Sequence, residues 1–247
     1  MMRAVVLAGG TGTRLHPLTE LMNKHLLPIG YYPMIHYAMN KLSEAGIREA
    51  LLITGKQSAG QFAAYLGGGE SWGIRLTYKI QEQPGGIAQA LSLAEDYIRP
   101  GEKFVVLLGD NLFEAPLSPY VEQYRKQPSG ALVLLKNVPD PSRYGVPVLK
   151  DGRIVSIEEK PARAASPYCV TGIYMYDSEV FSIIRSIRPS ARGELEITDV
   201  NNVYAAKGEL AFSILDGWWT DAGTHRSLFE AAKRFWDPQS RFGSGDQ

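Results

Sequence analysis

Glycines and cations near the N-terminus are spaced to hold a chain of phosphates. The apolar run Val5–Ala8 leads directly into three glycines between positions 9 and 12, with Arg14 just beyond them and Lys24 further on. This pattern predicts a buried strand that ends in a loop, whose exposed backbone N–H groups and neighbouring cations bind a polyphosphate. The chemistry favours a nucleotide ligand, although a glycine-rich turn alone also suits a plain structural loop.

Two commoner phosphate loops are excluded by their spacing. A Walker A loop is Gly-x-x-x-x-Gly-Lys-Ser/Thr, and no lysine followed by a hydroxyl residue stands at that spacing. A dinucleotide-binding turn needs a third small residue where this chain has Leu15, followed at once by a helix, whereas Pro17 lies just beyond. The loop therefore belongs to neither class.

Two aspartates are candidates for a ligand site. Asp110 follows the apolar run Val105–Leu108, at the carboxyl end of an expected buried strand, where open α/β sheets bind their ligands. An aspartate there can equally cap the next helix. Asp221 stands in Trp-Thr-Asp-Ala-Gly-Thr, where an aspartate near glycine is more often a turn residue. The four histidines show no ligand pairing, and no Ser-His-Asp or Cys-His arrangement is evident.

Strand patterns alternate with helical patterns over the first half of the chain. The strand patterns are Arg3–Ala8, Ala50–Thr54, Ile74–Ile80, Phe104–Leu108 and Ala131–Lys136. Apolar residues at helical spacing run from Met34 to a stop at Gly46, and from Ile87 to a stop at Pro100. Repeated β–α–β units predict an α/β fold with a doubly wound, mostly parallel central sheet.

Shorter strands and further helices are expected after about residue 146. Asp151-Gly152 predicts a hairpin between strands 146–149 and 154–159, and helices are expected near 178–186, 197–207 and 224–235. Because no Pro/Gly/Ser-rich linker interrupts the chain, we expect a single domain over 1–240, followed by a loose tail over 241–247.

Composition excludes several classes of partner. Lys and Arg total 26 and Asp and Glu total 26, so the protein has no net charge that would attract it to nucleic acid or to a membrane. No apolar segment approaches the length needed to span a membrane, and the N-terminal residues do not have the pattern of a signal peptide. The single cysteine, Cys169, excludes an internal disulfide and reads as a small buried hydrophobe. We expect a cytoplasmic protein.

The N-terminal motif is Leu-Ala-Gly-Gly-x-Gly-Thr-Arg-Leu-x-Pro-Leu-Thr, with Lys24 before Leu-Leu-Pro. It resembles the sugar-1-phosphate nucleotidylyltransferases, most closely the short glucose-1-phosphate thymidylyltransferases. Matching motifs follow in the family's order along nearly the whole chain. They are Tyr78-Lys79-Ile80-Gln81, Gly86-Ile87-Ala88-Gln89-Ala90, Leu108-Gly109-Asp110-Asn111, Arg143-Tyr144-Gly145-Val146, Glu158-Glu159-Lys160-Pro161, Val170-Thr171-Gly172, Arg192-Gly193-Glu194-Leu195-Glu196-Ile197-Thr198-Asp199 and Trp219-Thr220-Asp221-Ala222-Gly223-Thr224.

This resemblance implies thymidylyl transfer from dTTP to glucose 1-phosphate, with release of pyrophosphate. It places the nucleotide in a half of about 1–145 and the sugar in a half of about 146–240. It also implies that Asp110 and Asp221 converge on Mg²⁺, an ion that prefers carboxylate, phosphate and water oxygens. Arg14 and Lys24 are assigned to the triphosphate, and Lys160 to the sugar phosphate.

The implied binding residues fall into two sets. Those for the nucleotide are Leu7, Gly9, Gly10, Gly12, Thr13, Gln81, Gln83, Gly86 and Asp110. Those for the sugar phosphate are Tyr144, Gly145, Glu159, Lys160, Val170, Thr171, Gly172, Arg192 and Trp219. The resemblance favours Gln81 as the residue that reads the pyrimidine, but Gln83 points the same way along an extended segment and stays open. A surface ion pair for Arg192 and a core position for Trp219 are the plain alternatives.

Three rival functions stay open. Uridylyl transfer by the same fold is one, because a pocket barely rejects a missing methyl group. A catalytically inactive regulatory relative is another, although such proteins usually lose Arg14, Lys24 or a metal aspartate. A glycosyltransferase would be expected to show an Asp-x-Asp motif where this chain has Asp110-Asn111-Leu112. Longer family members carry extra C-terminal helices with a regulatory site, so we expect no product feedback through such a site here. A homo-oligomer is compatible with the sequence.

Overall fold

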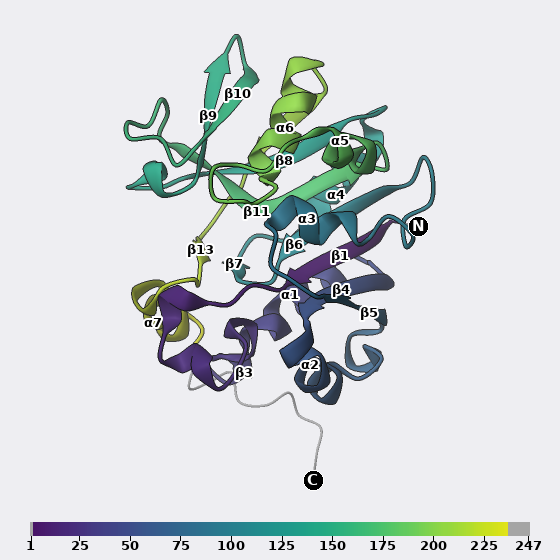
Figure 1. Ribbon diagram of the computed structural model, residues 1–247, viewed down its shortest axis with the longest axis vertical. Helices are drawn as coiled ribbons and strands as arrows, with labels where there is room; N and C mark the ends of the chain where they lie inside the picture. The colour runs from purple at the N-terminus through teal and green to yellow at the C-terminus, as the bar shows by residue number, and fades with distance from the viewer. Residues whose placement is uncertain (1, 237–247) are drawn as a thin grey trace.

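The computed structural model describes residues 2–236 and is built on one seven-stranded sheet (Figure 1). In spatial order its strands are β12 (Leu210–Ile214), β8 (Ala131–Asn137), β11 (Tyr168–Asp177), β6 (Lys103–Leu108), β1 (Arg3–Ala8), β4 (Glu49–Gly55) and β5 (Arg75–Gln81). β11 runs antiparallel to both of its neighbours, and the other pairings in this sheet are parallel. The predicted α/β fold with a mostly parallel sheet is confirmed.

Both faces of this sheet are buried, which explains the continuous apolar runs of its central strands. In β1, Ala4 and Val6 join the core on one face, while Val5 and Leu7 join the core on the other. Helices α1 (Met34–Glu44), α2 (Ala59–Leu66) and α4 (Ser118–Lys126) pack on the first face. Helices α3 (Ile87–Ser92), α5 (Val180–Ser186) and α6 (Ile197–Ala206) pack on the second. A strand covered on both sides needs apolar residues at successive positions.

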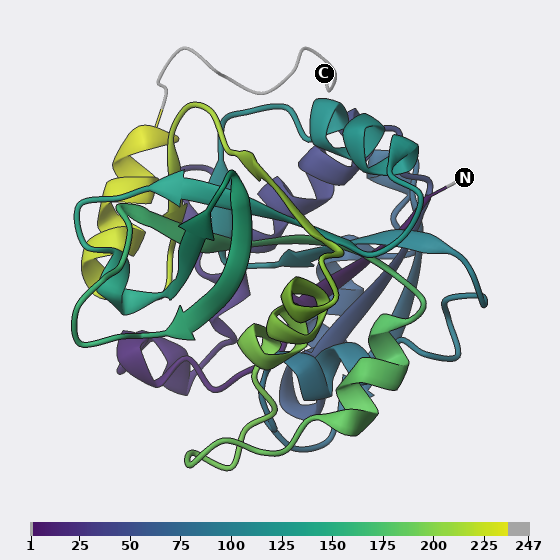
Figure 2. The ribbon, with the colours of Figure 1, turned by 90° about the horizontal axis from the view of Figure 1, so that it is seen from above.

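Smaller elements surround the sheet. The hairpin of β9 (Gly145–Lys150) and β10 (Arg153–Glu159) stands beside α6 in both views (Figures 1 and 2), where Asn202 of α6 bonds the Ile157 backbone. β7 (Asn111–Phe113) pairs with β13 (Trp219–Asp221), and β2 (Pro28–Ile29) pairs with β3 (Tyr32–Pro33). A capping box at Thr224 begins α7 (His225–Arg234). Short 3₁₀ turns cover Thr13–Leu15, Leu18–Glu20, Lys24–Leu26, Lys56–Ser58, Glu70–Trp72 and Pro141–Arg143.

Several elements differ from their predictions. α3 ends at Ser92, and the chain continues in turns with bonds such as Ala94 N to Leu91 O at 2.9 Å. Ala94 and Ile98 are still buried, so the apolar spacing serves the core without a continuous helix. Asp221, for which a turn position was the plain alternative to a metal-ligand role, is the last residue of β13 and pairs with Asn111. The tail predicted over 241–247 lies outside the described residues.

Two further observations concern membrane spans and the cysteine. Within residues 2–236, no helix is long and apolar enough to cross a membrane. Cys169 is a free, buried thiol in β11, and burial raises its pKa to about 12.

Candidate active site

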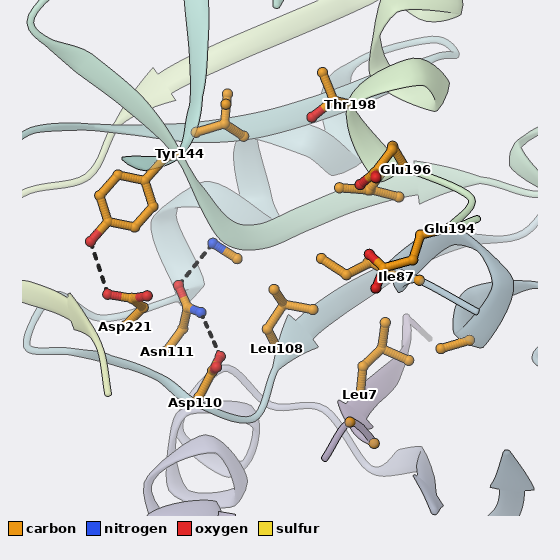
Figure 3. A pocket seen from close by; sticks show the side chains of 18 of the residues that line it. Leu7, Ile87, Leu108, Asp110, Asn111, Tyr144, Glu194, Glu196, Thr198 and Asp221 are labelled. Carbon is orange, nitrogen blue, oxygen red and sulfur yellow. Dashed lines mark hydrogen bonds between the residues drawn. The ribbon is translucent and has the colours of Figure 1, made fainter. Parts of the chain in front are cut away.

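A cleft of about 400 Å³ opens at the carboxyl ends of β1, β5 and β6 and continues to the β9–β10 hairpin (Figure 3). It is the position at which open α/β sheets bind ligands. The cleft brings together most of the residues predicted from the sequence. They are Leu7, Gly9, Gly10, Arg14, Lys24, Gln81, Gly86, Asp110, Tyr144, Gly145, Glu159, Lys160, Val170, Gly172, Arg192, Trp219 and Asp221.

Four predicted residues do not line this cleft. Thr171 directs its hydroxyl to the Leu134 carbonyl at 2.9 Å, while its neighbours Val170 and Gly172 face the cavity. Gln83 is exposed beyond the end of β5. Gly12 and Thr13 follow the glycines that reach the cleft: Gly12 precedes the 3₁₀ turn Thr13–Leu15, and Thr13 is its first residue.

The glycine loop turns tightly beside the cavity. Gly10 has a φ of 89°, a left-handed conformation that favours glycine. A second glycine lies beside Arg14: a Cβ at Gly223 would lie 2.8 Å from Arg14 Nη2 and 3.5 Å from Asp221 Oδ2. The missing side chain at Gly223 therefore lets the Arg14 guanidinium lie close to the end of β13.

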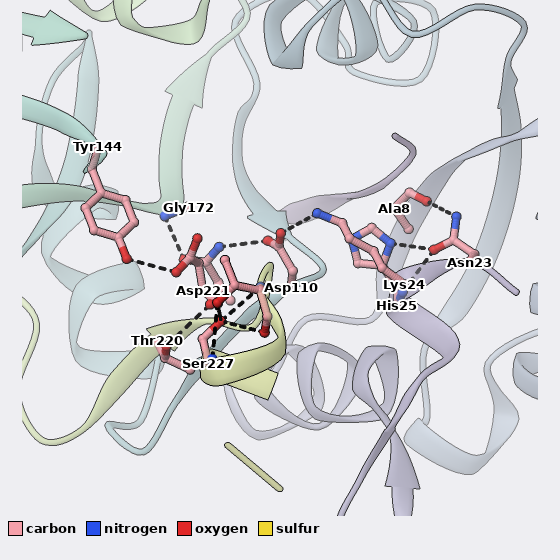
Figure 4. Close-up of polar contacts among 12 residues, drawn as sticks. Ala8, Asn23, Lys24, His25, Asp110, Tyr144, Gly172, Thr220, Asp221 and Ser227 are labelled. Carbon is pink, nitrogen blue, oxygen red and sulfur yellow. Dashed lines mark hydrogen bonds and ion pairs between the residues drawn. The ribbon is translucent and has the colours of Figure 1, made fainter. Parts of the chain in front are cut away.

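Lys24 and Asp110 form an ion pair on the floor of the cleft (Figure 4). The Lys24 ammonium contacts Asp110 Oδ2, and the Asn111 amide donates to Asp110 Oδ1 at 3.0 Å. Burial alone raises the pKa of the Asp110 carboxyl, but Lys24 and these hydrogen bonds outweigh it and hold the pKa well below its usual range. Asp110 is therefore ionised at neutral pH. Burial lowers the pKa of the adjacent His25 to about 3, so its ring is neutral.

Asp221 has a different environment from Asp110. Its Oδ1 accepts a hydrogen bond from the Tyr144 hydroxyl at 2.8 Å. Burial and the charge of Asp110 raise the pKa of Asp221, against the opposing effects of the Tyr144 bond and of Arg14. Two carboxylates thus face one cavity and repel each other, an arrangement that a shared cation would stabilise.

Asn111 is the main polar residue that the sequence reasoning missed. Its Oδ1 accepts from Gly172 N and from Trp219 Nε1, both at 2.8 Å, while its amide nitrogen bonds Asp110. This side chain joins β7, β11 and β13 beside the cavity. Its position directly after Asp110 was the feature of the sequence that could have pointed to it. The remaining lining residues are His25, Pro84, Ile87, Ala90, Leu108, Arg143, Tyr174, Glu194, Glu196, Ile197, Thr198 and Asn201.

A second group of charges lies at the hairpin end of the cleft. Lys160 Nζ is 3.2 Å from Glu159 Oε1, whose other oxygen accepts from Thr198 Oγ1 at 2.6 Å. Lys160 has a φ of 46°, an uncommon conformation for a residue other than glycine, and such strain clusters at ligand sites. Arg192 reaches the same region from the loop before α6 and bonds Glu196 Oε1 at 2.8 Å. Arg192 thus both lines the cleft and forms an ion pair.

The wall near the glycine loop is formed by Gln81 and Gly86. Gln81 is 6% exposed and its side chain lies against Gly9. Gly86 has a φ of 97°, and a Cβ there would lie 2.5 Å from the Leu195 carbonyl oxygen. This wall thus carries the side-chain amide of Gln81 and, at Gly86, a position without a side chain.

Within residues 2–236, no group of three or more His, Cys, Asp or Glu side chains is placed to hold a metal ion. The carboxylates of Asp110 and Asp221 lie in the same cleft, as Figure 3 shows.

Comparison with known proteins identifies the family. The nucleotidyl transferase family model matches residues 3–237. The glucose-1-phosphate thymidylyltransferase of Actinoplanes sp. is 46% identical over 227 residues, which cover 90% of this chain and 74% of that protein. The enzyme of the same name from Neisseria meningitidis is 43% identical over 235 residues, covering 94% and 81%.

Solved structures agree with this result. A Bacillus anthracis protein, assigned as a glucose-1-phosphate thymidylyltransferase and solved with sucrose, has a TM-score of 0.92 at 50% identity and covers 98% of both chains. A UDP-glucose pyrophosphorylase solved with UDP-glucose has a TM-score of 0.83 at 27% identity, covering 96% of this chain and 98% of that one. The protein therefore belongs to the nucleotidyl transferase family, among the glucose-1-phosphate thymidylyltransferases.

Proposed function

We propose that this protein transfers a thymidylyl group from dTTP to α-D-glucose 1-phosphate, giving dTDP-glucose and pyrophosphate. The observation that carries the proposal is the cleft itself. Arg14, Lys24 and two carboxylates gather near the glycine loop, and Lys160 and Arg192 gather at the hairpin end. The cleft thus offers two separate cationic groups, as a reaction between two phosphate-bearing substrates requires. The names of the relatives supply the nucleotide and the sugar.

The reaction needs positioning more than acid–base chemistry. An oxygen of the sugar phosphate attacks the α-phosphorus of dTTP, a new P–O bond forms, and the bond to the β-phosphate breaks with pyrophosphate as the leaving group. The second pKa of a phosphate monoester is about 6, so the nucleophile is largely ionised at neutral pH. The chain must therefore align two anions and neutralise the charge on the reacting phosphate.

The cations are assigned by their place in the cleft. Arg14 and Lys24 adjoin the glycine loop and are proposed to bind the triphosphate. Lys160 stands beside Glu159 in the half of about 146–240, where Glu159 can accept sugar hydroxyls while the ammonium holds the sugar phosphate. The nucleotide half is proposed to cover about 1–145. Homo-oligomerisation and a cytoplasmic location stay predictions.

The cofactor is proposed to be Mg²⁺, held by Asp110 and Asp221. Their donors fit it: both are carboxylate oxygens in one cleft, and Mg²⁺ is commonly bound by one or two carboxylates together with substrate phosphates. When bound, Mg²⁺ supplies charge neutralisation at the phosphates. Burial, and after it the charge of Asp110, raises the pKa of Asp221, and a cation held by both residues would offset the repulsion between their carboxylates.

Uridylyl transfer is the second candidate. It is favoured by the likeness to a UDP-glucose pyrophosphorylase solved with UDP-glucose. Thymine and uracil differ by one methyl group, which a pocket discriminates by roughly 10-fold to 200-fold at most. The preference for dTTP rests on the higher identity of the thymidylyltransferases.

A pyrophosphate-release assay tests the proposal. It crosses dTTP, UTP, CTP, ATP and GTP with the 1-phosphates of glucose, galactose, mannose and N-acetylglucosamine. We expect the highest kcat/KM for dTTP with glucose 1-phosphate. Higher kcat/KM with UTP would favour the second candidate. No pyrophosphate from any pair would indicate an inactive relative.

A further inference from the structure

The side-chain amide of Gln81 is held from two sides. Its Nε2 donates to Gln89 Oε1 at 2.6 Å. Its Oε1 lies against Gly9, where a Cβ would come within 2.3 Å of it. Gln81 is also buried, so its amide is kept in one of its two orientations instead of rotating freely.

Gln89 reaches Gln81 from the first turns of α3, without lining the cleft itself. Its side chain lies across Gly85, where a Cβ would stand 2.9 Å from Gln89 Cγ. The Gly85 carbonyl accepts from Leu195 N at 2.8 Å, so the turn that carries Gln89 is tied to the loop before α6. Gln89 is therefore fixed in place and acts on the cleft through Gln81.

This contact determines which hydrogen-bonding groups Gln81 has left. A glutamine amide has two N–H donors and one carbonyl acceptor. One N–H is used by Gln89, and one N–H and the carbonyl oxygen remain. A thymine or uracil edge presents a carbonyl oxygen beside the N3–H, which matches this pair. A cytosine edge presents an amino group beside the unprotonated N3, which requires the two groups of Gln81 in exchanged positions.

We propose that Gln89 is a positioning residue that sets the orientation of the Gln81 amide and thereby selects thymine and uracil over cytosine. The proposal rests on the proposed function, in which Gln81 reads the base. To accept cytosine, Gln81 must turn over and direct its oxygen at Gln89. Gln89 must then turn over as well and offer its own N–H. The selection of thymine and uracil over cytosine thus depends on the orientations of two hydrogen-bonded amides, those of Gln81 and Gln89. A hydrogen-bond acceptor at position 89 holds Gln81 in the orientation that reads thymine.

Two substitutions at position 89 separate this role from simple packing. Gln89→Met keeps the length of the side chain and removes the acceptor, whereas Gln89→Glu keeps the acceptor and removes the donor. Gln83→Met is the matched control, because Gln83 is an exposed glutamine near the same strand end. Binding of dTTP and of dCTP is measured by calorimetry in Mg²⁺, together with the melting temperature of each variant and its KM for glucose 1-phosphate.

In Gln89→Met the ratio of dTTP to dCTP affinity should fall by about tenfold, the usual scale of one lost polar match. Gln89→Glu should keep the ratio at or above that of the wild type, and Gln83→Met should leave it unchanged. The melting temperature and the KM for glucose 1-phosphate should stay near wild type in all three. If Gln89→Met does not fold, Gln89→Leu takes its place.

An equal loss of affinity for both nucleotides, or an unchanged ratio in Gln89→Met, would overturn the inference and leave Gln89 a packing residue. A ratio that collapses in Gln89→Glu would also overturn it. Because binding is measured directly, the test stands apart from the reaction. A wild-type protein that prefers dTTP to dCTP but releases no pyrophosphate would refute the proposed function and leave the role of Gln89 intact.

Discussion

The Lys24 ammonium pairs with the Asp110 carboxylate across the floor of the cleft, while Asp221, which faces the same cavity, pairs with the neutral hydroxyl of Tyr144. The two acidic residues therefore differ in charge balance before any ligand binds. The pKa of Asp110 is lowered and that of Asp221 is raised. Their contributions to the stability of the ligand-free protein should have opposite signs.

Asp110→Asn should destabilise the ligand-free protein, whereas Asp221→Asn should not. A carboxyl whose folded-state pKa is depressed stabilises the fold above its ordinary pKa, and this contribution is lost as pH falls. A carboxyl whose pKa is raised opposes folding once ionised, so its neutral replacement removes a cost. In urea unfolding near pH 7.5 without metal, Asp110→Asn should lower the free energy of unfolding by about 1–3 kcal/mol, and Asp221→Asn should match or exceed wild type. Equal losses in both variants would contradict this assignment.

The same two variants should lose turnover together. If both carboxylates hold Mg²⁺, either substitution should lower kcat by orders of magnitude, and EDTA should abolish wild-type activity until Mg²⁺ is restored. Steady-state pyrophosphate release checks this. The proposed metal site would be wrong if either variant kept more than about a tenth of wild-type activity, a difference of only about 1.4 kcal/mol in the activation barrier.

Substitutions of the cationic residues at the two ends of the cleft should affect the kinetics of different substrates. Arg14→Ala and Lys24→Ala should impair the use of dTTP, and Lys160→Ala should chiefly raise the KM for glucose 1-phosphate, because the bound ground-state phosphate already carries the charge that Lys160 meets. Lys56→Ala is the control, since Lys56 is exposed and outside the cleft. If Lys160→Ala weakened dTTP binding and spared glucose 1-phosphate, the two subsites would have to be exchanged.

Local sequence patterns determined much of the sheet, but not the direction of every strand. Val5 and Val6 face opposite cores, so an unbroken apolar run identified β1 as a strand covered on both sides. The antiparallel direction of β11 is fixed by pairing with β6 and β8, which no local pattern of β11 encodes. The pairing of Asp221 with Asn111 is likewise a long-range contact, so Asp221 alone resembled a turn residue.

The same holds for the cleft: some of its residues can be assigned from the local sequence pattern, and others only from contacts between distant parts of the chain. Alternation along β11 could have excluded Thr171, because adjacent residues of a strand point to opposite faces. Asn111 could not have been found in this way, since its partners Gly172 and Trp219 are 61 and 108 residues distant. The choice between Gln81 and Gln83, open in the sequence, becomes a contrast between a buried residue in the cleft and an exposed one outside it.

Base reading by Gln81 depends on the donor and the acceptor of its side-chain amide. A side-chain amide can donate to a pyrimidine carbonyl and accept from the N3–H, whereas Gln81→Glu removes the donor and places a negative charge against the carbonyl. A lost buried polar match costs roughly 1–3 kcal/mol. Gln81→Glu should therefore lower kcat/KM for dTTP and UTP together by about tenfold or more, with the KM for glucose 1-phosphate little changed. Gln83→Glu carries the same change of charge outside the cleft and should be nearly silent. If Gln83→Glu were the damaging substitution, Gln83 would be the residue that reads the base.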